Sequence, residues 1–522
     1  MKKTWKFLTA LSLALLMVSC SGAAIPVDNA DTADAAETVE TTSGDEAETT
    51  HEYIFDSLFD AKKAMFEAEE LPLAINMYEE EDIEEFRALK QELNDVIASG
   101  NLTQEIAEEY YLKFTEAKEK DLRVKQGDIP RVYINTYGQG ITWGYSSCDV
   151  VIVSGNTEKY KVTIEDGAMI SVRGNSTASA PKTPFNLRFP EKISLLGMDK
   201  GRKWSFLANM YDKTLMRNYL SYYLAAKMEL PYTSMCRYCD VYVDGRYMGN
   251  YTALEPVTDG KGRVEIDVTN YEYIFEIDMN RSGLAYYIKP MYGQRIGVSK
   301  PDVVTEDDKM VIDSFFDLME DAIASHDMSK YSQYIDVDSF VNFYIHAEIT
   351  KSIDVYDFST RYFLKGGKLY AGPVWDYDLS MGNVSNTCSE EKYFIYCNNR
   401  GYGTGTEDSA DGIWMDNYWF HELLQDPEFK ALVIERFEEV YPIIENLYTD
   451  NELGQNVIDW LLDKYGASFI RNYADDGAGW SFHTRFSGIE KNEILDDYYA
   501  EVEWLRDWLR RRTEYVAFYL MS

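Results

Sequence analysis

The spacing of apolar residues changes along this chain, and the changes limit the folds that it can adopt. Residues 53–122 place apolar side chains three and four positions apart, as Phe86, Leu89 and Leu93 do, which is the period of an amphipathic helix. Beyond Pro130 the period becomes two, which indicates strands, and in the second half of the chain it is mostly helical again. The sequence therefore predicts an α+β fold.

The first twenty residues indicate export. Three lysines precede an apolar run at residues 7–18, the charge order and length of a secretory signal. The run ends in Leu16-Met17-Val18-Ser19-Cys20, which resembles a bacterial lipobox. We expect residues 1–19 to be removed and Cys20 to carry a lipid on the outer face of the bacterial cell membrane, with secretion as the alternative if the lipobox is not used.

The next two segments are predicted to be a tether and a helical module. Residues 20–52 are acidic, contain no Lys or Arg and have almost no large apolar side chain, so they cannot bury enough surface to fold. Residues 53–122 form a predicted three-helix bundle, in which Thr103 is a plausible N-cap. Residues 97–106 resemble the FIVAR-type modules of bacterial surface proteins, which implies a spacer or a module that engages a cell-wall or surface partner.

Charge excludes one class of partner. The 522 residues include 51 Lys and Arg against 89 Asp and Glu, a net charge of -38. Binding to a nucleic-acid backbone needs a positive footprint, so we expect no nucleic-acid partner. Membrane contact is expected through the lipid anchor alone.

A loop at residues 171–184 has the composition of an anion site. Gly174 and several small hydroxyl residues lie between Arg173 and Lys182, and an alternating strand follows from Phe185. Such a loop could place backbone N–H groups and two cations around an anion, although an exposed loop with ordinary surface charges is the alternative.

The stretch from Arg361 to Gly382 carries the strongest chemical signal. Gly366-Gly367 separates two short apolar runs and predicts a tight hairpin. The second run is predicted to deliver Asp376 and Asp378 at its end, where a spacing of two in a strand would aim both carboxylates at one face, as Mg²⁺ requires. The alternative is a turn whose acids are only solvated.

The cysteines leave their chemistry open. Cys236 and Cys239 form a Cys-x-x-Cys pair without the second pair that zinc usually needs. Buried thiols or local disulfides are both compatible with Cys148, Cys236, Cys239, Cys388 and Cys397, and the pairing is not predicted.

Several motifs, in this order, resemble the CotH kinase family, named for a spore coat protein. They are Arg-Gly-Asn-Ser at 173–176, Pro-Lys at 181–182, Asp-Lys-Thr-Leu-Met-Arg-Asn at 212–218, the hairpin and following Glu at 241–255, and Gly-Pro-Val-Trp-Asp-Tyr-Asp-Leu-Ser-Met-Gly at 372–382. The resemblance implies an atypical protein-kinase-like bilobal domain, with a β-rich lobe and a helical lobe, over residues 128–385. Residues 386–522 are expected to complete the helical lobe.

The resemblance also implies roles for particular residues. Asp354 matches the family's catalytic Asp, with Asp357 as its rival, and Asp376 and Asp378 match the metal ligands. Ser359 stands where family members often carry a metal-binding Asn, and a hydroxyl is the weaker ligand. Lys182 fits the phosphate-binding role, Arg173 an accessory one, and Glu255 could orient Lys182 through an ion pair. The resemblance also implies the cofactors ATP and Mg²⁺ or Mn²⁺.

Two leading functional hypotheses and one weaker alternative follow. The first is an extracytoplasmic kinase that transfers the γ-phosphate of ATP to Ser or Thr of a surface or secreted protein. The second is a catalytically weak kinase-fold scaffold or binding protein, which Ser359 favours. A carbohydrate-active enzyme is a weaker third, because no acidic pair has a distinguishing spacing.

Overall fold

The computed structural model describes parts of residues 88–113 and then residues 129–153, 162–277, 283–288, 296–355, 358–385, 418–451, 454–474, 477–491 and 493–521. The chain divides into two compact units, Met1–Arg123 and Val124–Ser522. The signal segment, Cys20, the tether and the first predicted helix lie outside the described residues.

The N-terminal unit is helical where it is described. Helical residues occur between residues 88 and 96 and between residues 105 and 113. Thr103 Oγ1 accepts a hydrogen bond from the Ile106 N–H at 3.3 Å, as the predicted N-cap requires. The three-helix bundle and the FIVAR-like character stay predictions.

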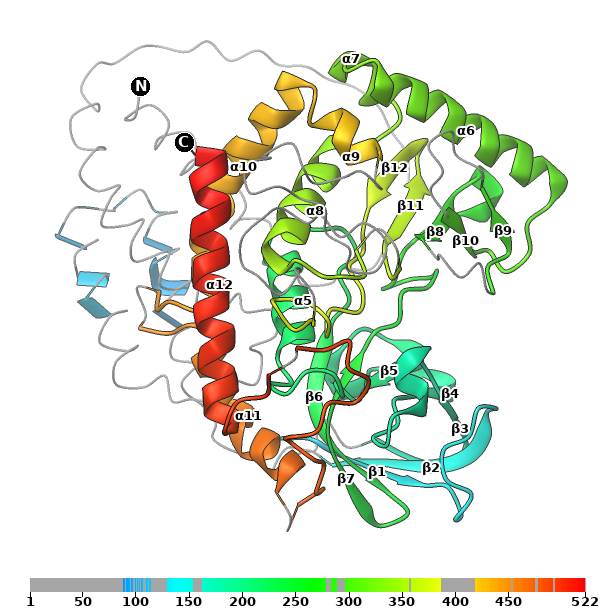
Figure 1. The fold of residues 1–522 in the computed structure, drawn as a ribbon, viewed down its shortest axis with the longest axis vertical. Helices are drawn as coiled ribbons and strands as arrows, with labels where there is room; N and C mark the ends of the chain where they lie inside the picture. Colours follow the sequence, from blue (N-terminus) through cyan, green and yellow to red (C-terminus); the bar gives the residue numbers. More distant parts are fainter. Residues whose placement is uncertain are drawn as a thin grey trace. The chain divides into compact units, whose positions relative to one another are not determined.

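The second unit begins with a closed seven-stranded barrel (Figure 1). Its strands are β1 (Arg131–Asn135), β2 (Ser146–Val153), β3 (Val162–Val172), β4 (Phe185–Ile193), β5 (Gly201–Leu207), β6 (Cys236–Val243) and β7 (Arg246–Leu254), in the order β1-β2-β3-β4-β5-β7-β6. β1 closes the barrel by pairing in parallel with β6. Alternate side chains, including Phe185, Leu187, Trp204 and Phe206, fill the interior with an apolar core.

A second sheet holds five strands in the order β12-β11-β8-β10-β9. They are β8 (Tyr273–Ile277), β9 (Tyr286–Tyr287), β10 (Ile296–Lys300), β11 (Arg361–Lys365) and β12 (Lys368–Ala371), and all neighbours pair antiparallel. The predicted hairpin at Gly366-Gly367 is confirmed. Both glycines have positive φ, of 58° and 78°, which a tight two-residue turn of this hand needs.

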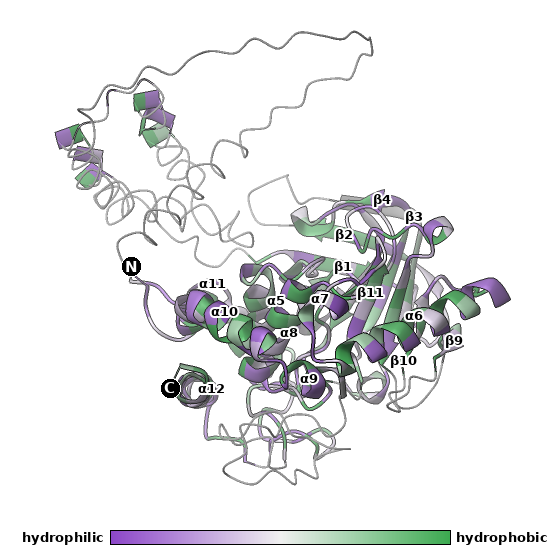
Figure 2. Cartoon of the chain, turned by 90° about the horizontal axis from the view of Figure 1, so that it is seen from above, coloured by the Kyte–Doolittle hydropathy of each residue, from purple (hydrophilic) through white to green (hydrophobic). Residues whose placement is uncertain are grey.

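Helices pack around these sheets. They are α5 (Arg217–Lys227), α6 (Glu306–Ala324), α7 (Met328–Tyr331), α8 (Val337–Thr350), α9 (Tyr418–Leu423), α10 (Pro427–Glu445), α11 (Val457–Tyr473) and α12 (Tyr498–Met521). α6 carries both hydrophilic and hydrophobic residues along its length, as a surface helix does (Figure 2). By contrast α5 and α8 are buried along most of their length. None of the helices in the described ranges combines the length and the apolar character needed to cross a bilayer.

The C-terminal region contacts the rest of this unit through a buried ion pair. Arg512 on α12 forms an ion pair with Glu348 on α8 at 2.7 Å, and both side chains are fully buried. Figure 1 shows α12 running alongside α8 and α10. The predicted α+β class is confirmed, and α10, α11 and α12 agree with the mostly helical period of the second half of the chain.

The thiols that the structure describes are reduced. Cys148, Cys236 and Cys239 are free and buried. Burial raises the pKa of the Cys148 and Cys236 thiols to about 12, which leaves them protonated and unreactive. Cys388 and Cys397 lie outside the described residues.

Candidate active site

The segment that carries Asp376 and Asp378 is a loop. β12 ends at Ala371, so the prediction that a strand delivers the two acids on one face is wrong. Pro373 has no N–H with which to continue the ladder, and Asp376 adopts a left-handed φ of 65°. The two carboxylates are therefore placed by the contacts of the loop and not by strand alternation.

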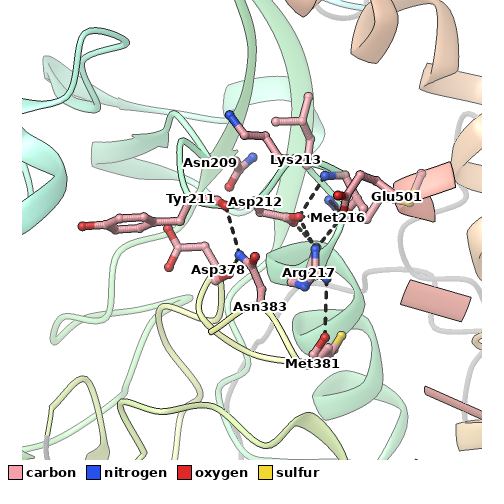
Figure 3. A network of polar contacts seen from close by, with 12 residues as sticks. Asn209, Tyr211, Asp212, Lys213, Met216, Arg217, Asp378, Met381, Asn383 and Glu501 are labelled. Atoms are coloured by element: carbon pink, nitrogen blue, oxygen red, sulfur yellow. Dashed lines mark hydrogen bonds and ion pairs between the residues drawn. The ribbon is translucent and has the colours of Figure 1, made fainter. Parts of the chain in front are cut away.

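Helix α5 holds this loop from one side. The Asn218 Oδ1 atom accepts a hydrogen bond from the Tyr377 N–H at 2.7 Å, and the Tyr222 hydroxyl oxygen accepts one from the Asp376 N–H at 3.4 Å. The Asn383 side chain donates to the carbonyl oxygens of Asp378, at 2.8 Å, and Tyr211, at 3.0 Å (Figure 3). Because these side chains lie on both flanks of the loop, its backbone is fixed at each aspartate.

A buried ion pair braces the end of the loop. Arg217 and Asp212, each 1% exposed, are 2.5 Å apart between Nη1 and Oδ1 (Figure 3). Arg217 Nε also donates to the Ser380 carbonyl at 3.1 Å. Met216 is the N-cap residue of α5, and Asp212 accepts the N–H of Arg217, the first helical residue.

Gly382 follows directly and must be a glycine. Its φ is 77°, and a Cβ there would lie 2.6 Å from atoms of both Trp504 and Trp508. The close approach of this backbone to α12 therefore depends on the missing side chain.

Three predicted acids converge on one place. Burial raises the pKa of Asp378 well above its ordinary value, and the negative charges of Asp376, Asp354 and Asp212 raise it further. Asp354 lies in a different segment from Asp376 and Asp378, so the tertiary structure brings these acids within electrostatic range of one another. Their catalytic and metal-binding roles stay predictions. Burial and the neighbouring negative charges thus both disfavour the ionised form of Asp378.

Two arginines face this cluster. The positive charge of Arg173 opposes the rise in the pKa of Asp378, and its guanidinium lies 5.5 Å from the ring centre of Trp375. Burial lowers the pKa of Arg361 to about 9, although the negative charge of Asp376 acts to raise it. The Arg361 side chain forms an ion pair with Glu276. Arg361 is not among the predicted site residues, although it begins the hairpin that leads into the Asp376 loop.

Asp354 and Ser359 lie beside the same loop. They line one small hollow together with Pro373, Trp375 and Tyr377. The Asp354 carbonyl accepts the Phe358 N–H at 2.8 Å, and Ser359 has a left-handed φ of 55°. Asp357, the rival for the catalytic role, lies outside the described residues.

Comparison with known proteins gives the family. The sequence profile described as CotH kinase protein matches residues 170–516, which is more than half of the chain. The chain belongs to the CotH kinase protein family. No curated protein matches it.

The CotH match extends well past Asn383, where the motifs that reveal the family in the sequence cease. It takes in α9 to α11 and most of α12. At the level of the family, membership indicates a CotH-like protein kinase.

Two of the residues predicted to bind the cofactor have other partners in this CotH domain. Lys182 is 1% exposed, and its Nζ donates to the carbonyl oxygens of Ala208, at 2.9 Å, and Asn250. Burial lowers its pKa well below the ordinary value. Glu255 forms its ion pair with Arg263 at 2.8 Å, so the proposed pairing of Glu255 with Lys182 is not the one in the structure.

The two carboxylates of the loop suit a divalent cation whose remaining ligands come from a substrate. In the described part of the chain, no group of three or more His, Cys, Asp or Glu side chains is positioned to hold a metal ion. Mg²⁺ in phosphoryl-transfer enzymes, however, is usually bound by one or two carboxylates together with substrate phosphates. Asp376 and Asp378 are of the right type for that role, since a bound cation would offset the burial and the neighbouring negative charge that raise the pKa of Asp378.

Proposed function

We propose that this chain is an extracytoplasmic CotH-like protein kinase that transfers the γ-phosphate of ATP to Ser or Thr of a surface or secreted protein. The observation that carries the proposal is the convergence of Asp354, Asp376 and Asp378 in a member of this family. Export rests on the signal segment and Cys20.

The proposed chemistry assigns each acid a task. Asp376 and Asp378 would hold Mg²⁺ or Mn²⁺, which supplies charge neutralisation for the phosphates when bound. Asp354 orients the acceptor hydroxyl and accepts its proton. A bond forms from the hydroxyl oxygen to the γ-phosphorus, the bond from that phosphorus to the β–γ bridging oxygen breaks, and ADP leaves.

Arg173 and Arg361 are the cations best placed to neutralise the phosphates, since both interact with the charges of this cluster. Arginine suits this task because its planar guanidinium can donate two parallel hydrogen bonds to a phosphate. Lys182 could act there only after releasing the Ala208 and Asn250 carbonyls, and its phosphate-binding role stays a prediction.

The test is label transfer. The full-length protein, purified in detergent, is incubated with γ-labelled ATP and Mg²⁺ or Mn²⁺, alone and with Ser-rich acceptor proteins. Asp354→Asn and Asp376→Asn should each lower incorporation by about 100-fold or more, the scale of a lost general base or metal ligand. Asp307→Asn is the matched control, because Asp307 is exposed on α6.

The outcomes separate the two hypotheses. Incorporation that Asp307→Asn retains and both site variants lose supports the kinase. Nucleotide binding without incorporation supports the weak scaffold, which the neutral Ser359 at a metal-ligand position favours. Incorporation that survives both site variants refutes the assignment of the acids.

A further inference from the structure

A groove on the outer face of the barrel lies on β1 and its neighbours. It has a volume of about 370 Å³, and its lining includes Tyr133, Asn135, Asp149, Val151, Tyr242 and Asp244. We call it the β1 groove. None of these residues belongs to the acidic cluster of the candidate active site, so the groove needs its own explanation.

Aromatic rings form one wall of the β1 groove. Tyr133 pairs with Tyr242 across β1 and β6, and Tyr242 pairs with Tyr247 across β6 and β7. The ring centres of Tyr133 and Tyr242 are 4.8 Å apart with planes inclined by 23°, and those of Tyr242 and Tyr247 are 5.1 Å apart. Tyr133 is 37% exposed, and Tyr137, at the end of the groove, is 56% exposed. The cross-strand register therefore creates a row of rings on an outer surface, where large aromatic side chains commonly mark a binding site.

A carboxylate faces the same groove. Asp149 stands opposite Asn135 in the β1–β2 register. Its Oδ1 atom is buried and receives no hydrogen bond from the part of the chain that the structure describes. The Asp149 residue also lines the groove, where its carboxylate can accept hydrogen bonds from the hydroxyls of a ligand.

Irregularities in two strands coincide with the groove. The β2–β3 register shifts between Cys148 and Val150, at Asp149, and the β6–β7 register shifts between Val241 and Tyr242. A bulge redirects the side chain at which it occurs and is common beside functional sites. The extra residues lie on the neighbouring strands, on β3 opposite Asp149 and at Met248 on β7 beside the partner of Tyr242. The two irregularities are therefore next to groove residues, one on each side of β1.

The chemistry of the groove favours one kind of ligand. The barrel is closed, so β1 has neighbours on both sides and offers no free edge to an extended peptide. Asp149 and Asp244 disfavour an anionic ligand. Tyr133 and Tyr242 stack on each other, so a sugar ring would pack its C–H groups against the exposed parts of the Tyr133 and Tyr137 rings while its hydroxyls donate to a carboxylate. A neutral sugar therefore suits both walls.

We propose that the β1 groove binds a neutral polysaccharide. This site is independent of phosphoryl transfer, since it uses none of the residues assigned to that reaction. Polysaccharide binding would hold the protein at an extracellular glycan surface.

Affinity electrophoresis of the full-length protein in detergent tests the proposal. Soluble neutral β-glucan, xylan and β-mannan are cast into native gels, with polygalacturonate as the anionic comparison. At least one neutral polysaccharide should retard the protein. Tyr133→Ala and Tyr242→Ala should each weaken that retardation by about tenfold, the scale of one lost stacking contact with its buried area.

Two further variants separate binding from folding. Tyr133→Phe keeps the ring and should retain binding, and Tyr499→Ala removes a tyrosine on α12 that is 55% exposed and should leave binding unchanged. Thermal unfolding of each variant shows whether the fold persists. Absence of retardation by every neutral polysaccharide would overturn the proposal, as would tighter binding to polygalacturonate or retardation that persists in a folded Tyr133→Ala variant.

Discussion

The buried ion pair between Arg217 and Asp212 should be among the most sensitive positions of this domain. Arg217 bonds to Asp212 at 2.5 Å and to the Ser380 carbonyl at 3.1 Å, and its Nη2 is 3.4 Å from the Met381 carbonyl. It thus connects the start of α5 to the loop that carries Asp376 and Asp378.

Arg217→Met would leave the Asp212 carboxylate buried without its cation. Removal of one partner of a buried pair typically costs about 3–5 kcal/mol. Asp212 would keep hydrogen bonds from the Thr214 N–H, the Thr214 hydroxyl and the backbone N–H of residue 217. These remaining donors place the expected loss of unfolding free energy near the lower limit, about 3 kcal/mol.

The loss can be measured by urea unfolding followed by circular dichroism. Arg510→Met is the control, because Arg510 also pairs with two acids but lies exposed on α12, and it should cause no measurable change. The double variant Asp212→Asn with Arg217→Met should be more stable than Arg217→Met alone, since it buries no unpaired charge.

A fall of less than about 1 kcal/mol for Arg217→Met, which is the scale of an exposed ion pair, would refute this reasoning. So would a double variant that is no more stable than the single one. Either result would mean that water reaches Asp212 and replaces the arginine.

Two other predictions concern charge inside the domain. Because the pKa of Asp378 is raised in the folded state, its protonated carboxyl stabilises the metal-free native state at low pH. This stability is lost as the pH rises through the folded-state pKa. Asp378→Asn should therefore be more stable than the parent at pH 8 in EDTA. Mg²⁺ should raise the melting temperature of the parent more than that of the variant, and equal responses would argue against a metal role for Asp378. His346 is fully buried on α8 beside the Ser221 carbonyl, and burial lowers its pKa from 6.5 to about 4. As the pH falls, the unfolded state therefore takes up a proton on this histidine before the folded state does. The stability that neutral His346 contributes should fall by about 3 kcal/mol between pH 7 and pH 4, and His346→Phe should lack this part of the pH dependence in urea unfolding.

Local patterns in the sequence gave a good account of the elements. Tyr273–Ile277 is the strand that its β-branched and aromatic residues predict, and the hairpins at Asp244-Gly245 and Gly366-Gly367 fall where those dipeptides indicate. These features depend on the preferences of neighbouring residues, which the sequence displays directly. β5 (Gly201–Leu207) was missed, and its exposed first half carries Arg202 and Lys203.

The sequence by itself determined the α+β class and the family, and it indicated the acids that we propose for the site. Only the tertiary structure decided which groups meet: that β1 closes a barrel against β6, that Arg361 joins Arg173 near the acids, and that Lys182 is turned toward two carbonyls. Periodicity and motifs record the local preferences of the backbone. The partner of a buried charge depends on which distant segments the packing brings together, and one sequence does not record that choice.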